Sequence, residues 1–302
     1  MKCVVTGGAG FIGSNLTERL VREGHDVTVI DNFHTGSREN LSDFIGKINL
    51  IESDAGKISK LGLSGIDAIF HLGIYSSAPM YKENPALVGK AISEAIELFE
   101  YSYKNNIKVV WASSSSVYNG LNPPHRENME IKVTDYYTEV RIAMERLALL
   151  YSRMHSLDSV ALRFFSVYGP REKAKGKYAN LVTQFLLGMK KGIAPVIFGD
   201  GTQTRDFIYV SDVVKGIIRA LEKGKPAGIY NIGTGKNYSL NELVGKLNEK
   251  LGSRVKPEYV ENKIKNYVQH TRADTKKSEK ELGFKAGIQL DEGIEKLIEY
   301  YK

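Results

Sequence analysis

Short runs of apolar, often β-branched residues alternate with helical patterns through the first half of the chain. Six of these runs are typical of strands: residues 2–6, 26–30, 48–51, 68–71, 108–112 and 159–164. After the first run, Ile12, Leu16 and Leu20 recur every four residues and share one face of a predicted helix, which Gly24 ends. Further helices are expected at about 85–104 and 135–155. This alternation predicts right-handed βαβ units and a parallel sheet of the α/β class, with helices on both faces.

The second half of the chain is less regular. Residues 169–177 have the composition of a loop, and Ser211 and Ser239 each precede an apolar-periodic run that they are expected to cap. Helices are predicted near 178–190, 211–222, 239–251 and 290–301. The sequence contains no internal repeat and no clean linker between the halves. The C-terminal half is therefore expected to form a smaller ligand-binding part, with some segments of the chain crossing from one domain to the other.

Composition narrows the class of protein. A chain of 302 residues, 42% hydrophobic and 25% charged, is ordinary for a folded protein of roughly two domains. It has no apolar run long enough to span a membrane, and Met1 leads directly into Cys3-Val4-Val5 without a charged leader. A single cysteine excludes an internal disulfide, and Cys3 is expected to pack in the core. The expected location is therefore the cytoplasm, with no membrane association.

The net charge suits an anionic ligand. The 42 basic and 35 acidic residues give +7, and Lys173, Lys175 and Lys177 form a small basic cluster. No nucleic-acid-binding motif accompanies this charge, so general solubility explains it better than nucleic-acid binding does. The six histidines are scattered without ligand spacing, and no metal site is expected.

A glycine-rich loop follows the first predicted strand. Gly8, Gly10 and Gly13 satisfy G-x-G-x-x-G in the order strand, loop, helix and second strand. Such a loop lets the backbone approach a pyrophosphate, which the N–H groups of the helix N-terminus bind. Asp31 ends the second strand, where its carboxylate can accept from a ribose 2′-hydroxyl and would repel a 2′-phosphate. The sequence therefore predicts NAD rather than NADP. Only Arg38, a few residues further on, could weaken this preference for NAD.

A serine run follows the fifth predicted strand, at residues 113–116. Further on, Tyr137, Arg141 and Glu145 share one face of a predicted helix. A tyrosine can act as a base only where a nearby cation favours its phenolate. From these residues alone two interpretations stay open: a catalytic serine and tyrosine, or a polyserine turn and an interfacial tyrosine. Arg141 could equally point outward and pair with Glu145.

Taken together, these motifs resemble the extended short-chain dehydrogenases/reductases, in particular the nucleotide-sugar epimerases and dehydratases typified by UDP-glucose 4-epimerase. The resemblance covers nearly the whole chain, in order. Its motifs lie at residues 7–14, 31–32, 54, 71–72, 113–118, 162–171, 199–210, 231–235, 273–274 and 281–284.

The resemblance implies a seven-stranded Rossmann domain and a smaller C-terminal α/β substrate domain. It implies the catalytic residues Ser114, Tyr137 and Arg141. For NAD it implies contacts from Gly7, Gly10, Phe11, Ile12, Gly13, Asp31, Asn32, Asp54, Ala55, Leu72, Tyr137 and Arg141. For the nucleotide-diphosphate sugar it implies Ser114, Ser166, Asn180, Arg205, Lys263 and Lys265. The NAD domain is expected over 1–165, joined by segments at about 200–232, and the substrate domain mainly over 166–302.

The chain departs from the family pattern at several positions. The lysine of Y-x-x-x-K is Arg141, and family asparagines are replaced by Ser166 and Ala91. The R-P-G-D segment with a second phosphate-binding arginine is absent, which makes Lys263 and Lys265 its candidate replacements. The acidic pair of the dehydratases is Ser115 and Ser116 here, so the resemblance favours epimerisation over water elimination.

The expected activity is therefore NAD-dependent 4-epimerisation of a nucleotide sugar of the UDP-glucose/UDP-galactose kind, through a transient 4-keto intermediate. Two alternatives are a nucleotide-sugar dehydrogenase or reductase that releases NADH, and a binding homologue with weakened catalysis. The family also implies a homodimer through a four-helix bundle built from the helices near 85–104 and 135–155.

Overall fold

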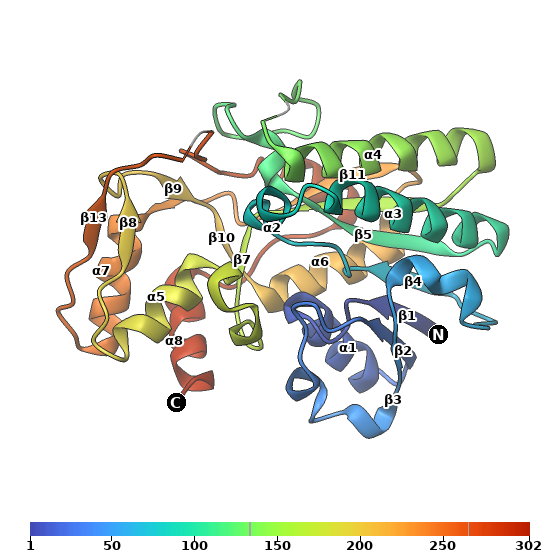
Figure 1. The fold of residues 1–302 in the computed structure, drawn as a ribbon, viewed down its shortest axis with the longest axis horizontal. Helices are drawn as coiled ribbons and strands as arrows, with labels where there is room; N and C mark the ends of the chain where they lie inside the picture. The colour runs from blue at the N-terminus through green and yellow to red at the C-terminus, as the bar shows by residue number, and fades with distance from the viewer. Residues whose placement is uncertain (133, 265) are drawn as a thin grey trace.

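A seven-stranded parallel sheet forms the centre of the computed structural model, which describes residues 1–132, 134–264 and 266–302 (Figure 1). The strand order in this described part of the chain is β11-β6-β5-β4-β1-β2-β3. The strands are β1 (Lys2–Thr6), β2 (Asp26–Asp31), β3 (Ile48–Glu52), β4 (Ala68–His71), β5 (Lys108–Ser114), β6 (Ser159–Phe164) and β11 (Gly228–Ile232). Each neighbouring pair is parallel, which confirms the predicted Rossmann-type sheet.

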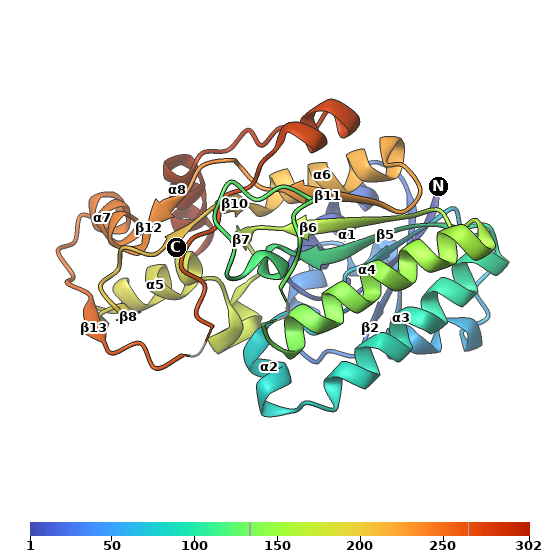
Figure 2. The same ribbon diagram turned by 90° about the horizontal axis from the view of Figure 1, so that it is seen from above.

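Helices cover both faces of this sheet (Figures 1 and 2). On one face α1 (Phe11–Arg22) and α6 (Val210–Lys223) pack on alternate strand residues such as Cys3, Val5 and Phe70. On the other face α3 (Leu87–Lys104) and α4 (Tyr136–His155) pack on Val4, Ile69 and Trp111. The sheet is thus apolar on both faces, which explains the nearly continuous hydrophobic runs of its strands.

The C-terminal half builds a smaller body beside the sheet (Figure 1). Helices α5 (Leu181–Met189), α7 (Leu240–Leu251) and α8 (Leu290–Tyr300) pack around one apolar cluster. Short strands pair as β7 (Ser166–Tyr168) with β10 (Phe207–Tyr209), β8 (Val196–Phe198) with β13 (Glu258–Val260), and β9 (Thr204–Arg205) with β12 (Tyr238–Ser239). A short helix, α2 (Ala78–Glu83), follows β4.

Of the two predicted helix caps, the structure confirms the one at Ser239 and not the one at Ser211. Ser239 caps α7 in a capping box, in which its side chain accepts from the Glu242 N–H and the Glu242 carboxylate accepts from the Ser239 N–H. The cap predicted at Ser211 is wrong. Helix α6 begins one residue earlier, at Val210, directly after the buried strand β10, so Ser211 lies inside the helix.

The single cysteine and the helices agree with the composition of the chain. Cys3 is fully buried, as predicted for a core residue, and burial raises the pKa of its thiol to about 11. Among the described residues, no helix combines the length and the apolarity that crossing a bilayer requires.

Candidate active site

A cleft of about 550 Å³ opens at the carboxyl ends of the sheet strands. The loops after β1, β2, β4 and β5 line one side of it, and residues of the C-terminal half line the other. Ligands of open α/β sheets bind at this edge. The cleft is therefore the candidate active site.

The glycine-rich loop supplies a cradle at the base of the cleft. Gly7 has a left-handed φ of 69°, and a Cβ on Gly13 would overlap the carbonyl oxygen of Gly7. Helix α1 begins directly after Gly10, without an acidic side chain in its first turn. Bare backbone and an open helix N-terminus therefore face the place where a diphosphate would lie. These residues fit the pyrophosphate of a dinucleotide.

Asp31 stands at the end of β2, beside this loop. Its side chain is 6% exposed, and its oxygens accept from the N–H groups of Ala9 (2.9 Å) and Phe33 (2.7 Å). Burial raises the pKa of Asp31, while these backbone hydrogen bonds favour the carboxylate. Arg38 is committed elsewhere, because its guanidinium pairs with Glu52 at 2.7 Å. The carboxylate thus lines the cleft without a neutralising cation from Arg38.

A hydrogen bond joins Asn32 of the cleft lining to Asp54. The Asn32 amide donates to the Asp54 carboxylate at 2.7 Å, and this bond holds the pKa of Asp54 below its usual range. Asn32, Ala55 and Leu72 line the cleft, whereas Asp54 is not among the lining residues. Asp54 therefore orients Asn32 in this structure.

Ser114 and Tyr137 come together in the cleft from different elements. Ser114 ends β5, and its Oγ accepts from the Ser116 N–H at 3.1 Å, which leaves the hydroxyl proton available. Tyr137 lies in the first turn of α4, which Asp135 caps by accepting from the Thr138 N–H at 2.8 Å. Both residues line the cleft.

Arg141 lies one helical turn beyond Tyr137 and faces inward. It is 2% exposed, and its Nη1 and Nη2 donate to the carbonyls of Ala112 (3.1 Å) and Tyr75 (2.8 Å). Within the described chain its Nε–H has no partner. The outward pairing with Glu145 does not occur, because Glu145 accepts from Arg163 at 2.7 and 2.9 Å instead. Arg141 thus brings a buried positive charge to the cleft.

On the opposite wall lie Ser166, Asn180 and Arg205. The Asn180 Oδ1 accepts from the Val182 N–H at 3.0 Å and so caps α5. The Arg205 Nη1 donates to the carbonyls of Thr204 and Gln269 at 2.9 and 3.1 Å, and burial lowers the pKa of this arginine. The structure therefore brings these three residues together in the lining of the cleft.

One of the two lysines expected to replace the missing arginine lies away from the cleft. The side chain of Lys263 is 80% exposed, pairs with Glu261 at 3.2 Å and is absent from the cleft lining. Lys265 lies outside the described residues.

Other side chains that the sequence interpretation missed do line the cleft: Glu94, Glu172, Lys175 and Tyr178. For Lys175, the signal in the sequence is the basic cluster at 173–177. No grouping of three or more His, Cys, Asp or Glu side chains with metal-binding geometry occurs in the described ranges.

Comparisons with known proteins agree with this geometry. Residues 3–233 match the NAD dependent epimerase/dehydratase family. A putative UDP-glucose 4-epimerase of Methanocaldococcus jannaschii is 35% identical over 99% of this chain and 98% of its own length. UDP-glucuronic acid decarboxylase 3 of Arabidopsis thaliana is 32% identical over 97% of this chain and 87% of its own. A UDP-glucose 4-epimerase of Thermotoga maritima, solved with UDP-glucose, superposes with a TM-score of 0.93 at 30% identity, over 100% of this chain and 98% of that one.

These matches extend over the sheet, the glycine-rich loop and the serine, tyrosine and arginine of the cleft. The cradle that only glycine can form, together with Asp31 at the end of β2, fits NAD, the cofactor that the family shares. The chain is a member of the NAD dependent epimerase/dehydratase family of nucleotide-sugar enzymes, and its cofactor is NAD.

Proposed function

We propose that this protein is an NAD-dependent 4-epimerase of a nucleotide sugar of the UDP-glucose/UDP-galactose kind. The observation that carries the proposal is the composition of the cleft around Ser114 and Tyr137. Among the described residues, the carboxylates that line the cleft are Asp31, Glu94 and Glu172, none of which comes from the serine segment. That segment presents Ser115 and Ser116, so it offers no acid to eliminate water from the sugar.

Each catalytic side chain has one task in this proposal. Tyr137, as phenolate, takes the proton of the sugar 4-hydroxyl and later returns it, while Ser114 donates its hydroxyl proton to the same oxygen and stabilises the charge that develops there. Bound NAD supplies the hydride acceptor and donor. Arg141 holds a buried guanidinium beside this tyrosine, with its carbon 4.9 Å from the centroid of the Tyr137 ring.

The nucleotide diphosphate is assigned to the opposite wall. Arg205 lines the cleft with a guanidinium whose Nη1 donates to two backbone carbonyls and whose carbon lies 5.5 Å from the centroid of the Tyr267 ring. A guanidinium fixed in this way can bind a phosphate through its remaining N–H donors. Asn180 has its Nδ2 available at the N-terminus of α5, and Ser166 lies beside it in the cleft lining. The Thermotoga maritima relative, solved with UDP-glucose, supports this class of substrate.

A screen of nucleotide sugars tests the proposal. Purified protein is incubated with UDP-glucose, UDP-galactose, their N-acetylated forms and UDP-glucuronate, and the products are separated by chromatography. Conversion between 4-epimers without net change in NADH absorbance supports the epimerase. Net NADH formation indicates a dehydrogenase, release of CO₂ from UDP-glucuronate indicates a decarboxylase like the Arabidopsis relative, and binding without turnover indicates a weakened homologue.

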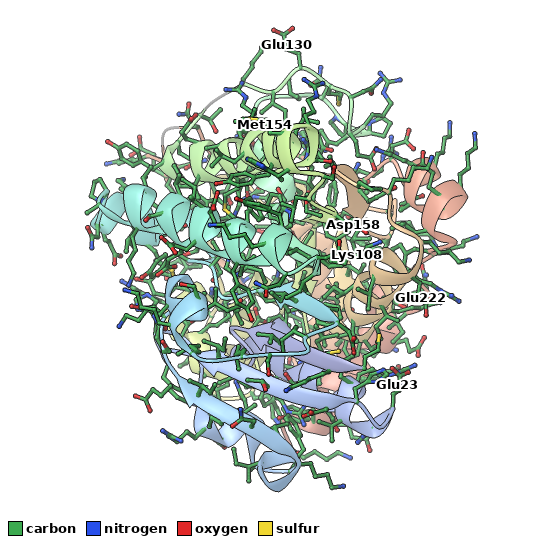
Figure 3. All side chains as sticks on the ribbon, turned by 90° about the vertical axis from the view of Figure 1, so that its right-hand side faces the viewer. Glu23, Lys108, Glu130, Met154, Asp158 and Glu222 are labelled. Carbon is green, nitrogen blue, oxygen red and sulfur yellow. The ribbon has the colours of Figure 1, made fainter. Side chains whose placement is uncertain are left out.

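We also propose that two copies pair through α3 and α4. Leu149, Leu150 and Met154 of α4 are 41%, 48% and 65% exposed, and Figure 3 labels Met154 on this side of the molecule. Exposed apolar side chains gathered on one helix are typical of an interface. Light scattering would show a dimer for the wild type and a monomer for Leu150→Glu/Met154→Glu.

The arrangement of the strands and helices also suggests how the chain divides into domains. We propose that residues 1–165, with segments from about 200–232, form the NAD domain and that 166–302 mainly form the substrate domain. The position of β11 and α6 against the sheet supports the crossing of the later segments into the NAD domain.

A further inference from the structure

Lys175 differs from the other lysines of its basic cluster. It lies on a short 3₁₀ segment, Lys173–Tyr178, that connects β7 with α5, and its side chain is 17% exposed and lines the cleft. Lys173 is exposed, and Lys177 is 68% exposed and pairs with Glu83. Only Lys175 of the three thus brings its charge into the cleft.

Two contacts hold the Lys175 ammonium between the two walls. Its Nζ lies 5.7 Å from the centroid of the Phe11 ring, in the first turn of α1. It also lies 3.5 Å from Oε1 of Glu172. Glu172 is fully buried and accepts from the Asn180 N–H at 2.8 Å and from the Thr183 hydroxyl at 2.5 Å. Glu172 therefore fixes the start of α5 and the position of Lys175 together.

The ammonium has hydrogen-bonding capacity left over. A lysine carries three N–H donors, and within the described residues Nζ of Lys175 makes no hydrogen bond, only the long ion pair with Glu172. Nearby, the first turn of α1 contains no acidic side chain, and its N-cap residue Gly10 has no side chain that could accept a hydrogen bond. A dianionic group in this place would be bound by both the helix N-terminus and the ammonium.

We propose that Lys175 binds a diphosphate group in the cleft. Two diphosphates could occupy this place, one from NAD and one from the nucleotide sugar. The contact with Phe11 of the glycine-rich loop favours the diphosphate of NAD. This inference concerns binding, so it does not depend on whether 4-epimerisation is the reaction.

The test compares Lys175→Gln with Lys173→Gln, which removes the same charge from an exposed position of the same segment. Calorimetry of protein freed of nucleotide measures Kd for NAD and, separately, for UDP. Loss of one charge-assisted contact should weaken NAD binding by Lys175→Gln about tenfold. Lys173→Gln should bind NAD like the wild type, and UDP binding should change in neither variant. Lys175→Arg, which keeps the charge, should restore most of the NAD affinity.

Each other outcome is decisive as well. A loss of UDP affinity with unchanged NAD affinity would support the diphosphate site and assign it to the nucleotide sugar. Equal affinities of Lys175→Gln and Lys173→Gln for both ligands would overturn the proposal. So would a Lys175→Arg variant that melts like the wild type yet binds NAD as weakly as Lys175→Gln, because the charge would then be irrelevant.

Discussion

The guanidinium carbon of Arg141 lies 4.9 Å from the centroid of the Tyr137 ring, one turn along α4. In the family pattern this position is a lysine, which is a compact point charge. Here two of the guanidinium nitrogens are bound to the carbonyls of Ala112 and Tyr75, so the charge is held in place by backbone on both sides. The arginine therefore retains the cation beside the tyrosine in a fixed position.

Replacing Arg141 tests this role. Arg141→Met should weaken NAD binding and reduce turnover, because the positive charge that lies beside the Tyr137 ring in the cleft is lost. Arg141→Lys should keep much of the activity, because the charge remains. Calorimetry with NAD and steady-state kinetics provide the measurements. An Arg141→Met variant with the wild-type NAD affinity and turnover would show that the arginine has only a packing role.

Removing the phenolic oxygen tests the catalytic pair. Tyr137→Phe should abolish turnover and leave NAD affinity nearly unchanged, since the ring and its contact with Arg141 remain. Ser114→Ala should lose about a hundredfold to a thousandfold in turnover, the effect of one donor to a developing oxyanion. The matched control is Tyr136→Phe, because Tyr136 precedes Tyr137 on α4 and is 53% exposed. Near-normal activity of Tyr137→Phe would refute the assignment.

Much of the fold follows from local pattern. All six strands predicted from apolar runs are present within two residues of the expected bounds. Most of them are buried on both faces and therefore mainly apolar, whereas β3 lies at the edge of the sheet and is only partly buried. The seventh strand, β11, is not predicted by the local sequence pattern. It is a short run, Gly228–Ile232, whose place at the edge of the sheet depends on pairing with β6 across a long sequence separation.

The site was predictable only where spacing constrains geometry. Asp31, Ser114 and Tyr137 each follow from the end of a strand or the start of a helix. The partner of Glu145 could not be predicted in this way, because Arg163 lies on the neighbouring strand β6, which helix periodicity does not describe. Likewise Lys175 reaches the cleft, and Lys263 does not, because of how the second half folds over the first.

Asp31 should determine the choice between NAD and NADP. Its carboxylate lines the cleft, and Arg38, the cation that follows it in the sequence, is bound to Glu52. NAD should therefore bind at least about tenfold more tightly than NADP, a difference of about 1.4 kcal/mol or more. Calorimetry with both dinucleotides measures the ratio. Equal affinities would mean that Arg38 leaves Glu52 to meet the 2′-phosphate, and Arg38→Gln would then weaken NADP alone.

Glu94 predicts a pH-dependent stability. It lies on α3 with a side chain 13% exposed. Burial, together with a smaller contribution from the Asp54 carboxylate, raises the pKa of its carboxyl from 4.5 to about 7 despite Lys90 at 3.7 Å. The folded chain therefore holds this proton more tightly than the unfolded chain does. Glu94 should cost no stability below about pH 4.5, an increasing amount between about pH 4.5 and 7, and a constant amount above.

Glu94→Gln should remove this cost. In urea unfolding of protein freed of nucleotide, the variant should match the wild type near pH 4 and exceed its free energy of unfolding near pH 8.5. The difference at the higher pH is at most about 3 kcal/mol, the free energy equivalent to the change in pKa. Glu97→Gln, an exposed change on the same helix, is the control and should show no such pH dependence. If Glu94→Gln were equally stabilising at both pH values, its effect would come from side-chain packing rather than from the ionisation of a buried carboxyl.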